Sequence, residues 1–277
     1  MSGRIAKAKV LKYSASQLST AEEVVAAEQL LAIRIDGEFY QDFLCLPGQE
    51  QDLALGWLFT AGVIDGIEDI RAINFCAAEP QADRPWACVE VGLRAATQAR
   101  GSDGDLPMRV LKGLGGGQKS SAELLSRLPS VNFEPRISAP ILTALMAKLP
   151  QRQEVFRQTG ATHAIAIASV QGEVIFSAED VGRHNALDKV IGRALREGLS
   201  LTDKIALLSG RVSYEMLFKA VRAGIPILAS VSAPTHLAIR LAEQWGLTLA
   251  GFVRGRRMNI YSHPERLTDL VPGGSAL

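Results

Sequence analysis

The sequence predicts an α/β fold whose N-terminal part is α+β. From Thr162 onward, continuous apolar strands alternate with amphipathic helices, which is typical of a mostly parallel sheet covered on both faces. Before that, apolar strand segments come in pairs joined by short turns, which favours hairpins. A glycine-crowded stretch lies between the two patterns. We therefore predict a polar lead-in over 1–28, an α+β domain over 29–135 with a glycine-rich loop at 101–121, and an α/β domain over 136–277.

Turn chemistry and period-two spacing define the N-terminal elements. Asp36-Gly37 is a favoured two-residue hairpin turn, and Pro47-Gly48 ends the strand after it. Apolar side chains alternate from Ala87 to Leu93, so they share one face of a strand. The predicted elements are strands over 30–35, 39–46, 69–75 and 86–93 and a helix over 49–60.

Caps and glycines define the elements of the second half. Ser138 is a suitable N-cap for the first helix, and Gly198, Gly224 and Gly246 each follow a helical segment. The predicted helices cover 138–149, 151–158, 183–196, 213–223 and 235–245, and the predicted strands cover 163–170, 173–177, 204–209, 225–231 and 247–253.

Composition limits the function classes. The 277 residues carry a formal net charge of +1, so no overall field attracts nucleic acid or an anionic membrane. The chain has no apolar run of the roughly 20 residues that a membrane span needs, and its N-terminus does not resemble a signal peptide. The three cysteines are odd in number and dispersed, which favours a reducing compartment. We expect a cytoplasmic protein that binds neither nucleic acid nor membrane.

Three strand ends in the α/β half lead into helix starts or turns with small, hydroxylated or basic residues. Helix N-termini present unpaired N–H groups, and arginine adds bidentate donors, so this combination favours a phosphorylated, nucleotide-like ligand. The alternative is that the hydroxyls are plain helix caps and the arginines a solvated cluster. The candidate binding residues here are Ser209, Arg211, Ser232, Thr235, Phe252, Val253, Arg254, Gly255, Arg256 and Arg257.

A second group of candidates lies where a strand ends and a helix begins. The run from Ala178 to Lys189 contains Asp180, Arg183 and His184, which could form the polar rim of a ligand pocket. We expect His184 to orient or to support structure rather than to move protons. The alternative is helix-start electrostatics with an internal ion-pair network.

The same run closely resembles the signature of the FdhD/NarQ family, accessory proteins that mature formate dehydrogenases. The resemblance continues collinearly through the segments 209–215, 232–235, 251–252 and 261–264, over about half of the chain. It implies that the C-terminal domain is a three-layer α/β/α sandwich similar to cytidine deaminases. Because this half contains no cysteine, the zinc site of those deaminases is not expected.

The resemblance also implies a ligand and partners. In the family, the segment that matches Phe252 to Arg257 contacts a bis-guanine-dinucleotide molybdopterin cofactor of molybdenum or tungsten, or GDP as a mimic of part of it. This chain keeps the basic, glycine-containing character of that segment without every residue of the family pattern. Formate dehydrogenase, a cysteine desulfurase and a second copy of the chain are the implied partners.

One family feature is missing. Family members carry sulfur as a persulfide on a CxxC loop, whereas the matching segment here has Gly117 and Ser120 in place of the cysteines. Sulfur exchange needs a thiolate. Cys88 reads as a small buried group, and Cys76, near a strand end, is the least implausible substitute, but we expect neither to serve. The Gly113–Ser120 stretch also misses a phosphate-binding P-loop by one residue in spacing.

The sequence therefore predicts an accessory protein for formate dehydrogenase maturation that binds the cofactor and supports its sulfuration and insertion. A non-catalytic chaperone or paralogue that binds the cofactor but has lost sulfur transfer is the alternative. A nucleotide-hydrolysing enzyme ranks below both. No catalytic residue and no resident metal are predicted.

Overall fold

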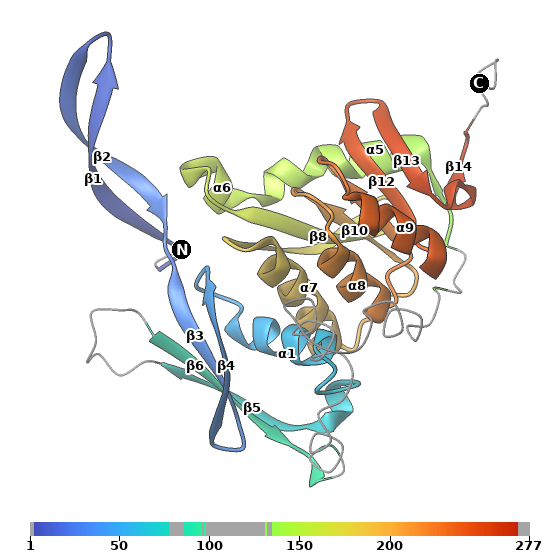
Figure 1. The fold of residues 1–277 in the computed structure, drawn as a ribbon, viewed down its shortest axis with the longest axis horizontal. Coiled ribbons are helices and arrows are strands. Elements are labelled where there is room, and N and C mark those ends of the chain that lie inside the picture. Colours follow the sequence, from blue (N-terminus) through green and yellow to red (C-terminus); the bar gives the residue numbers. More distant parts are fainter. Residues whose placement is uncertain (1–2, 78–85, 96, 98–130, 132–134, 271–277) are drawn as a thin grey trace.

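A computed structural model describes residues 3–77, 86–95, 97, 131 and 135–270 of the chain. It contains two main sheets with helices packed on them, and a hairpin that extends away from both (Figure 1). The glycine-rich stretch 101–121, with Gly117 and Ser120, lies outside the described residues. None of the helices in the described ranges is long and apolar enough to cross a membrane.

The N-terminal sheet confirms the predicted strands and hairpin. Its strand order is β4-β3-β6-β5, and helix α1 packs on it through a buried apolar cluster. Asp36 and Gly37 join β3 to β4 with φ values of 50° and 90°, the left-handed pair that suits a two-residue hairpin turn. The bounds are β3 Gln29–Ile35, β4 Glu38–Cys45, α1 Glu50–Thr60, β5 Ile70–Ala77 and β6 Trp86–Leu93.

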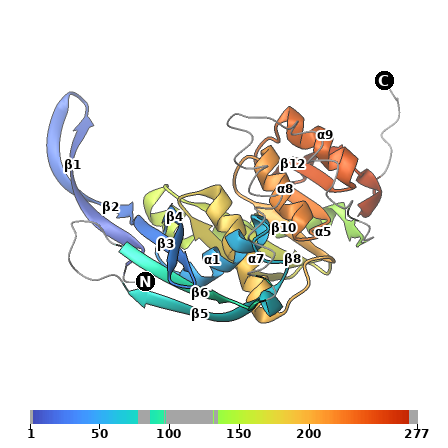
Figure 2. The same ribbon diagram turned by 60° about the horizontal axis from the view of Figure 1, so that its bottom comes forward.

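The polar lead-in predicted over 1–28 is instead a long antiparallel hairpin of β1 (Ile5–Ser14) and β2 (Gln17–Ala26). It projects from the body in both views (Figures 1 and 2). Two residues without the usual turn signature, Ala15 and Ser16, make its turn with φ values of 47° and 67°. Because the strands are largely exposed, they lack the apolar alternation that identifies a strand in a sequence.

The C-terminal sheet has the order β13-β12-β11-β10-β8-β9 and is mixed rather than mostly parallel. The neighbouring pairs β10–β11 and β11–β12 are parallel, while the three remaining pairs are antiparallel. Tight turns join β8 to β9 and β12 to β13, and such turns require antiparallel neighbours. The bounds are β8 His163–Ser169, β9 Val174–Asp180, β10 Lys204–Leu208, β11 Ile227–Ser230, β12 Thr248–Arg254 and β13 Arg257–Ser262. Strand β13 was not predicted, because its exposed, polar residues hide it in the sequence.

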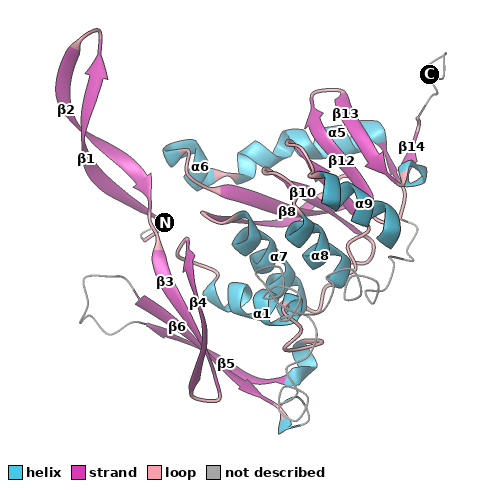
Figure 3. Cartoon of the chain, in the orientation of Figure 1, coloured by secondary structure: helices cyan, strands magenta, loops and turns pink. Residues whose placement is uncertain are grey.

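Helices cover both faces of this sheet, which makes the three-layer α/β/α sandwich (Figure 3). Within β8, Ile165 and Ile167 pack into the core under α7, α8 and α9, whereas Ala164 and Ala166 pack under α5. The bounds are α5 Ala139–Lys148, α6 Glu154–Thr159, α7 Arg183–Glu197, α8 Tyr214–Arg222 and α9 His236–Trp245. Short elements complete the fold: η1 Ile67–Asp69, β7 Ile137–Ser138, η2 Leu149–Arg152, η3 Pro264–Arg266 and β14 Leu267–Thr268.

Local signals explain most helix boundaries. Ser138 caps α5 by accepting a hydrogen bond from the Ile141 N–H at 3.3 Å. Gly198 and Gly246 end α7 and α9 in left-handed conformations. The helix predicted over 151–158 is shorter, because its first residues form η2.

Helix α1 is buried between the N-terminal sheet and α7, so it joins the two sheets (Figure 2). The two helices cross at Gly56 and Gly192. A Cβ added at Gly56 would lie 1.9 Å from the Asp188 carbonyl oxygen, and one added at Gly192 would lie 1.8 Å from that of Asp52. Glycine at both positions therefore allows the two backbones to touch.

Candidate functional site

The predicted site residues gather at one edge of the C-terminal sheet. The parallel strands β10, β11 and β12 all end there, with Leu208 beside Ser230 in register. Because β8 runs antiparallel to β10, it begins at the same edge, and His163 pairs with Asp180 where β9 ends. The carboxyl edge of a sheet of this kind is where α/β proteins build ligand sites.

Backbone hydrogen bonds tie the three predicted strand-end turns together at this carboxyl edge. The Val212 N–H donates to the Ala233 carbonyl at 3.2 Å, and the Thr235 N–H donates to the Val212 carbonyl at 2.9 Å. The Phe252 N–H donates to the Ser232 carbonyl at 3.1 Å. The turns that begin at Ser209, Ser232 and Phe252 thus lie side by side.

Two of the predicted hydroxyls have structural partners. Ser209 Oγ accepts a hydrogen bond from the Ala164 N–H at 2.8 Å, which fixes β10 against β8. Thr235 Oγ1 accepts one from the Ala238 N–H at 3.3 Å and caps α9. For these two side chains, the geometry matches the capping role that the sequence left open.

The basic segment after Gly251 forms the hairpin from β12 to β13. Phe252 lies on a bulge with a φ of 51°, and its ring is 44% exposed. A left-handed non-glycine residue of this kind costs about 1 kcal/mol, and such strain concentrates at functional sites. The next residue, Val253, is 1% exposed and packs in the core, so its side chain does not face a ligand at this edge. Exposed residues follow: Arg254, Gly255, Arg256 and Arg257.

Asp180 lies in a buried polar network that joins the two sheets. Its carboxylate pairs with Lys189 Nζ at 2.7 Å, and both side chains are at most 1% exposed. It also accepts hydrogen bonds from the Leu46 N–H at 3.1 Å and from Asn185 Nδ2 at 3.0 Å. The internal ion-pair alternative therefore describes Asp180 in this structure, and its contacts position the start of α7.

The start of α7 and the start of α8 present buried polar atoms that lack hydrogen-bond partners. These atoms are Arg183 Nε, His184 Nε2, Ser213 Oγ and the Tyr214 hydroxyl. Tyr214 is only 7% exposed, and leaving a buried polar group unpaired costs about 1–3 kcal/mol. A ligand with polar groups at this edge would relieve that cost, so these atoms favour a binding site.

Sequence reasoning missed Ser213 and Tyr214. Both belong to the 209–215 segment that resembles the family, yet neither was nominated, because a serine and a tyrosine at a helix start suggest a cap and a core residue. Their unpaired atoms appear only once α8 is placed beside α7.

The electrostatics of this edge favour an anion. Burial lowers the pKa of His184 to about 4, with further lowering from Arg183, Lys219 and His163. Burial and then the charges of Arg183 and Arg211 lower the pKa of His163. His184 Nε2 lies 2.9 Å from a Glu215 carboxylate oxygen without the alignment of a hydrogen bond. Both imidazoles are therefore neutral at pH 7 beside two guanidinium groups, a setting that attracts negative charge.

His163 lies directly against the Ser209 turn. A Cβ added at Gly210 would lie 3.0 Å from His163 Nδ1, so glycine permits this close approach. The His163 ring also borders the cluster of Arg183 and Arg211.

The family-like segment from Tyr261 to Pro264 lies at the opposite edge. Ser262 pairs with Leu249 near the start of β12, and the His263 carbonyl accepts a hydrogen bond from Thr248 Oγ1 at 2.8 Å. These residues support the sheet and line a separate hollow of about 440 Å³. The structure does not bring Ser262 and His263 to the carboxyl edge, whereas the Tyr261 ring lies against Gly251, where an added Cβ would be 2.9 Å from it.

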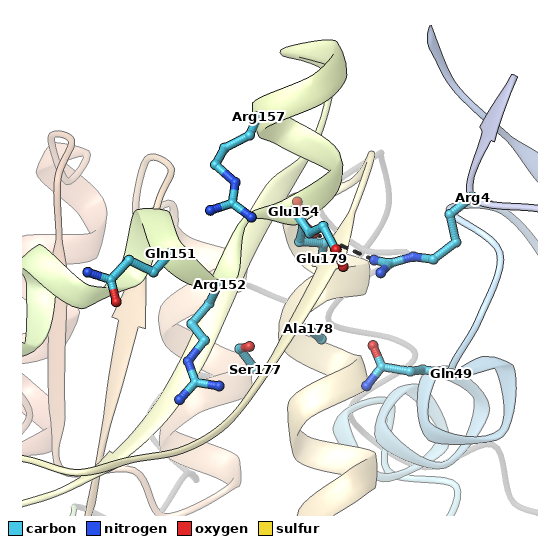
Figure 4. Close-up of a pocket in the computed structure, with 9 residues that line it drawn as sticks. All are labelled: Arg4, Gln49, Gln151, Arg152, Glu154, Arg157, Ser177, Ala178 and Glu179. Carbon is cyan, nitrogen blue, oxygen red and sulfur yellow. Dashed lines mark ion pairs between the residues drawn. The ribbon is translucent and has the colours of Figure 1, made fainter. Parts of the chain in front are cut away.

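A second hollow of about 360 Å³ lies beside the end of β9 and was not predicted (Figure 4). Arg4, Arg152 and Arg157 line it together with Ser177. Arg4 reaches from the start of the hairpin toward Glu179, at 3.7 Å. The Glu179 carboxylate is already satisfied by the N–H groups of residues 155 and 156 and by a threonine hydroxyl at residue 162. Arg152 and Arg157 lie close together in the sequence, but Arg4 is far from them, so only the tertiary structure brings the three arginines together.

No group of three or more His, Cys, Asp or Glu side chains in the described part of the chain is arranged to hold a metal ion. The carboxyl edge is instead built from guanidinium, hydroxyl and backbone N–H donors, which are the groups that bind phosphate.

Comparisons with known proteins show which family has this sequence and architecture. The model of the FdhD/NarQ family matches residues 26–268. Curated relatives named sulfur carrier protein FdhD include one from Anaeromyxobacter sp. (strain K), 37% identical over 96% of this chain and 94% of its own, and one from Nocardia farcinica, 37% identical over 99% of each. A crystal structure from Desulfotalea psychrophila, described as a candidate formate dehydrogenase accessory protein, superposes with a TM-score of 0.75 and 25% identity, over 95% of this chain and 99% of that one. The chain therefore belongs to the FdhD/NarQ family.

Proposed function

We propose that the protein supports the maturation of a formate dehydrogenase by binding a bis-guanine-dinucleotide molybdopterin cofactor of molybdenum or tungsten at the carboxyl edge of the C-terminal sheet. The cofactor is cargo, and the protein assists its sulfuration and insertion. The names of the relatives support this role. The observation that carries the binding site is the set of buried, unpaired polar atoms of Arg183, Ser213 and Tyr214 within a cationic cluster.

The residues at this edge have the chemical groups that would bind the phosphates and the rings of such a ligand. The diphosphate groups would meet the guanidinium groups of Arg183 and Arg211 and the N–H groups at the starts of α7 and α8. The half-exposed Phe252 ring offers a flat surface for a guanine or pterin ring. The exposed Arg256 lies on the hairpin that follows and would reach a phosphate or a ring edge.

Calorimetric titration with GDP tests the site. Arg256→Ala and Tyr214→Phe should each weaken GDP binding about tenfold, because a hydrogen bond to a charged group contributes about 1.5–3 kcal/mol. Arg71→Ala is the matched control, since Arg71 lies in the N-terminal sheet and pairs with Asp36. Absence of GDP and cofactor affinity in the wild-type protein would overturn the site. Equal weakening by all three variants would overturn its location.

A second candidate function is cofactor binding without sulfur transfer. It is favoured by one observation, the Gly117 and Ser120 that stand where the family has the cysteines of its CxxC loop. In this case the protein would hold and deliver the cofactor, while another protein would supply the sulfur. Incubation with a cysteine desulfurase and cysteine, followed by intact-mass analysis, should then leave the protein without added sulfur.

The proposed partners are a formate dehydrogenase, a cysteine desulfurase and a second copy of the chain, and the proposed location is the cytoplasm. Co-purification with formate dehydrogenase tests the first partner. Light scattering of the purified protein tests the homodimer, since a monomeric mass at micromolar concentration would contradict it.

A further inference from the structure

Two of the three cysteines are direct neighbours across an antiparallel strand pair. Cys76 on β5 lies opposite Cys88 on β6 in the register of the N-terminal sheet. They are separated in the sequence by the segment 78–85, which lies outside the described residues, so no CxxC-like spacing reveals the pair. The structure thus creates a dithiol where the sequence shows only dispersed cysteines.

The spacing of such a pair suits a reversible disulfide. Residues directly opposite each other in an antiparallel ladder have Cα atoms about 4.5–5.5 Å apart. Disulfides span Cα separations of about 4.4–6.8 Å, so the bond would form without moving either strand far. Both cysteines are free thiols in this structure.

The pair lies on the outer face of the sheet, away from α1. The alternate residues Val89 and Val91 of β6 pack under α1, which leaves Cys88 and Glu90 on the other face. Cys76 is exposed and Cys88 is half-buried, so a protein partner reaches Cys76 first. Cys45, in contrast, is fully buried, and burial raises its pKa to about 12, which makes it inert.

Cys88 ionises less readily than an ordinary thiol. Burial, followed by the neighbouring Cys76 thiol, raises the pKa of Cys88. Cys88 therefore stays protonated near neutral pH while the exposed partner is approached. The exposed Cys76 is therefore suited to accept the sulfur first, and the half-buried, protonated Cys88 to act second.

The dithiol lies toward the end of the N-terminal sheet that adjoins the candidate site. Cys88 is level with Ala32 of β3, which in turn is level with Asp42 of β4. Three residues beyond Asp42, β4 ends at Cys45, and the next residue, Leu46, donates its N–H to Asp180 at the carboxyl edge. The pair thus lies near the end of the sheet that is linked to Asp180, on the face that points away from α1.

We propose that Cys76 and Cys88 form a cross-strand dithiol that accepts a sulfane sulfur on Cys76 and releases it when Cys88 closes the disulfide. The inference rests on the proposed role in cofactor sulfuration and replaces the expectation that no cysteine takes over from the missing CxxC pair. It extends that role by naming the sulfur-bearing atom.

The chemistry balances in three steps. The Cys76 thiolate attacks the outer sulfur of a donor persulfide, so that a Cys76 persulfide forms and the donor leaves as a thiolate. The Cys88 thiolate then attacks the inner sulfur, which forms the Cys76–Cys88 disulfide and releases hydrosulfide. The sulfane sulfur is thereby reduced by the two electrons that the thiols lose. A small dithiol reductant returns both cysteines to thiols.

The test is incubation of the full-length protein with a cysteine desulfurase and cysteine, followed by intact-mass analysis and sulfide measurement. The wild-type protein should release sulfide and finish as a disulfide, two hydrogens lighter. Cys88→Ser should keep one added sulfur, mapped to Cys76, and release several-fold less sulfide. Cys76→Ser should neither gain sulfur nor release sulfide. Cys45→Ala, the control at the buried cysteine, should behave as the wild type.

A pH series adds a second readout. Sulfide release from the wild-type protein should accelerate as the pH rises, because the release step needs the Cys88 thiolate. Sulfur retained by Cys88→Ser should depend on pH much less. A merely exposed thiol would show no such split.

Two results would overturn the proposal: no added sulfur in Cys88→Ser, or sulfide release by Cys76→Ser equal to that of the wild type. GDP affinity is measured on the same preparations. Intact GDP binding with no sulfur on Cys76 overturns the dithiol alone and leaves the cofactor site standing. Loss of GDP binding with sulfur transfer intact overturns the cofactor site alone.

Discussion

At the residue scale, the carboxyl edge depends on a buried ion pair. Lys189 reaches Asp180 at 2.7 Å and donates to the Leu46 carbonyl at 2.8 Å, and its side chain is 1% exposed. The pair is satisfied from both sheets, which offsets the cost of burying two charges. It therefore serves as the tie between β4 and the start of α7.

Lys189→Met should destabilise the protein by about 3–5 kcal/mol, because it leaves the Asp180 carboxylate buried without its cation. Urea unfolding at pH 7 measures the loss. Glu197→Gln is the control, since it removes the exposed pair with Arg193 and should cost less than about 0.5 kcal/mol. Equal effects of the two substitutions would contradict the assignment of Asp180 and Lys189 as a structural pair.

The burial of His184 predicts how the stability of the protein depends on pH. Burial lowers its pKa to about 4, whereas the unfolded chain has an ordinary imidazole pKa near 6.5. The unfolded state therefore binds a proton first, and stability falls as the pH drops from about 6.5 toward 4. This group should contribute up to about 2 kcal/mol of the loss between pH 7.5 and pH 5.

The measurement is urea unfolding of the wild type and of His184→Gln at both pH values. The variant should lose less stability on acidification than the wild type does. The control is His236→Gln, at an exposed histidine on α9, which should keep the wild-type dependence. An unchanged pH dependence in His184→Gln would show that its imidazole titrates normally in the folded protein.

At the element scale, the contact between α1 and α7 decides how the two sheets meet. Gly56 and Gly192 let the helices touch along their backbones, and Thr60 Oγ1 donates to Asp188 Oδ1 at 2.9 Å beside the crossing. Lys219 of α8 completes this buried network by pairing with Asp188. Apolar packing and a polar network thus lock three helices in one arrangement.

Gly192→Ala should destabilise the protein by about 3 kcal/mol, because the added methyl group would overlap the Asp52 carbonyl and force the helices apart. In an open helix, the same change stabilises by about 0.5–1 kcal/mol. The sign of the change in stability, measured by thermal or urea unfolding, therefore shows whether the two helix backbones touch at Gly192. Gln51→Ala, on a half-buried position of α1, is the control and should change stability little. A stabilising Gly192→Ala would refute the backbone contact.

At the scale of the whole molecule, the two sheets should unfold as one unit. Besides the α1–α7 crossing, the Arg222 guanidinium of α8 donates to the Ile64 carbonyl at 3.2 Å and stacks 4.9 Å from the Phe59 ring centre. The core therefore continues from one sheet to the other. The division into two domains stays a prediction. The contacts between the two sheets predict that both unfold in a single transition.

Single-tryptophan variants check this cooperativity. Trp57 lies in the core of the N-terminal sheet and Trp245 in the core of the C-terminal sheet. In each of two variants, two of the three tryptophans are replaced by phenylalanine, so that either Trp57 or Trp245 remains. Within each variant, tryptophan fluorescence and far-UV circular dichroism should give the same urea midpoint. Different midpoints from the two probes within one variant would mean that the sheets unfold independently.

The sequence predicted those features that depend on neighbouring residues. Asp36-Gly37 indicated the first hairpin of the N-terminal sheet, Ser138 indicated the start of α5, and alternating apolar residues indicated β6, all as found. The segments that resemble the family also predicted membership, which the match over residues 26–268 bears out. Failures came where local signals are weak, as in the exposed hairpin of β1 and β2 and the polar edge strand β13.

By itself, the sequence determined most of the helices and strands after residue 28, several of their caps and turns, and the family, because periodicity and turn chemistry act over a few residues. Only the tertiary structure decided the mixed strand directions, the burial of Val253, and the unpaired atoms of Ser213 and Tyr214. It also placed Cys76 opposite Cys88. These features depend on which distant segments pair and in which register, and the packing of the whole core selects that pairing.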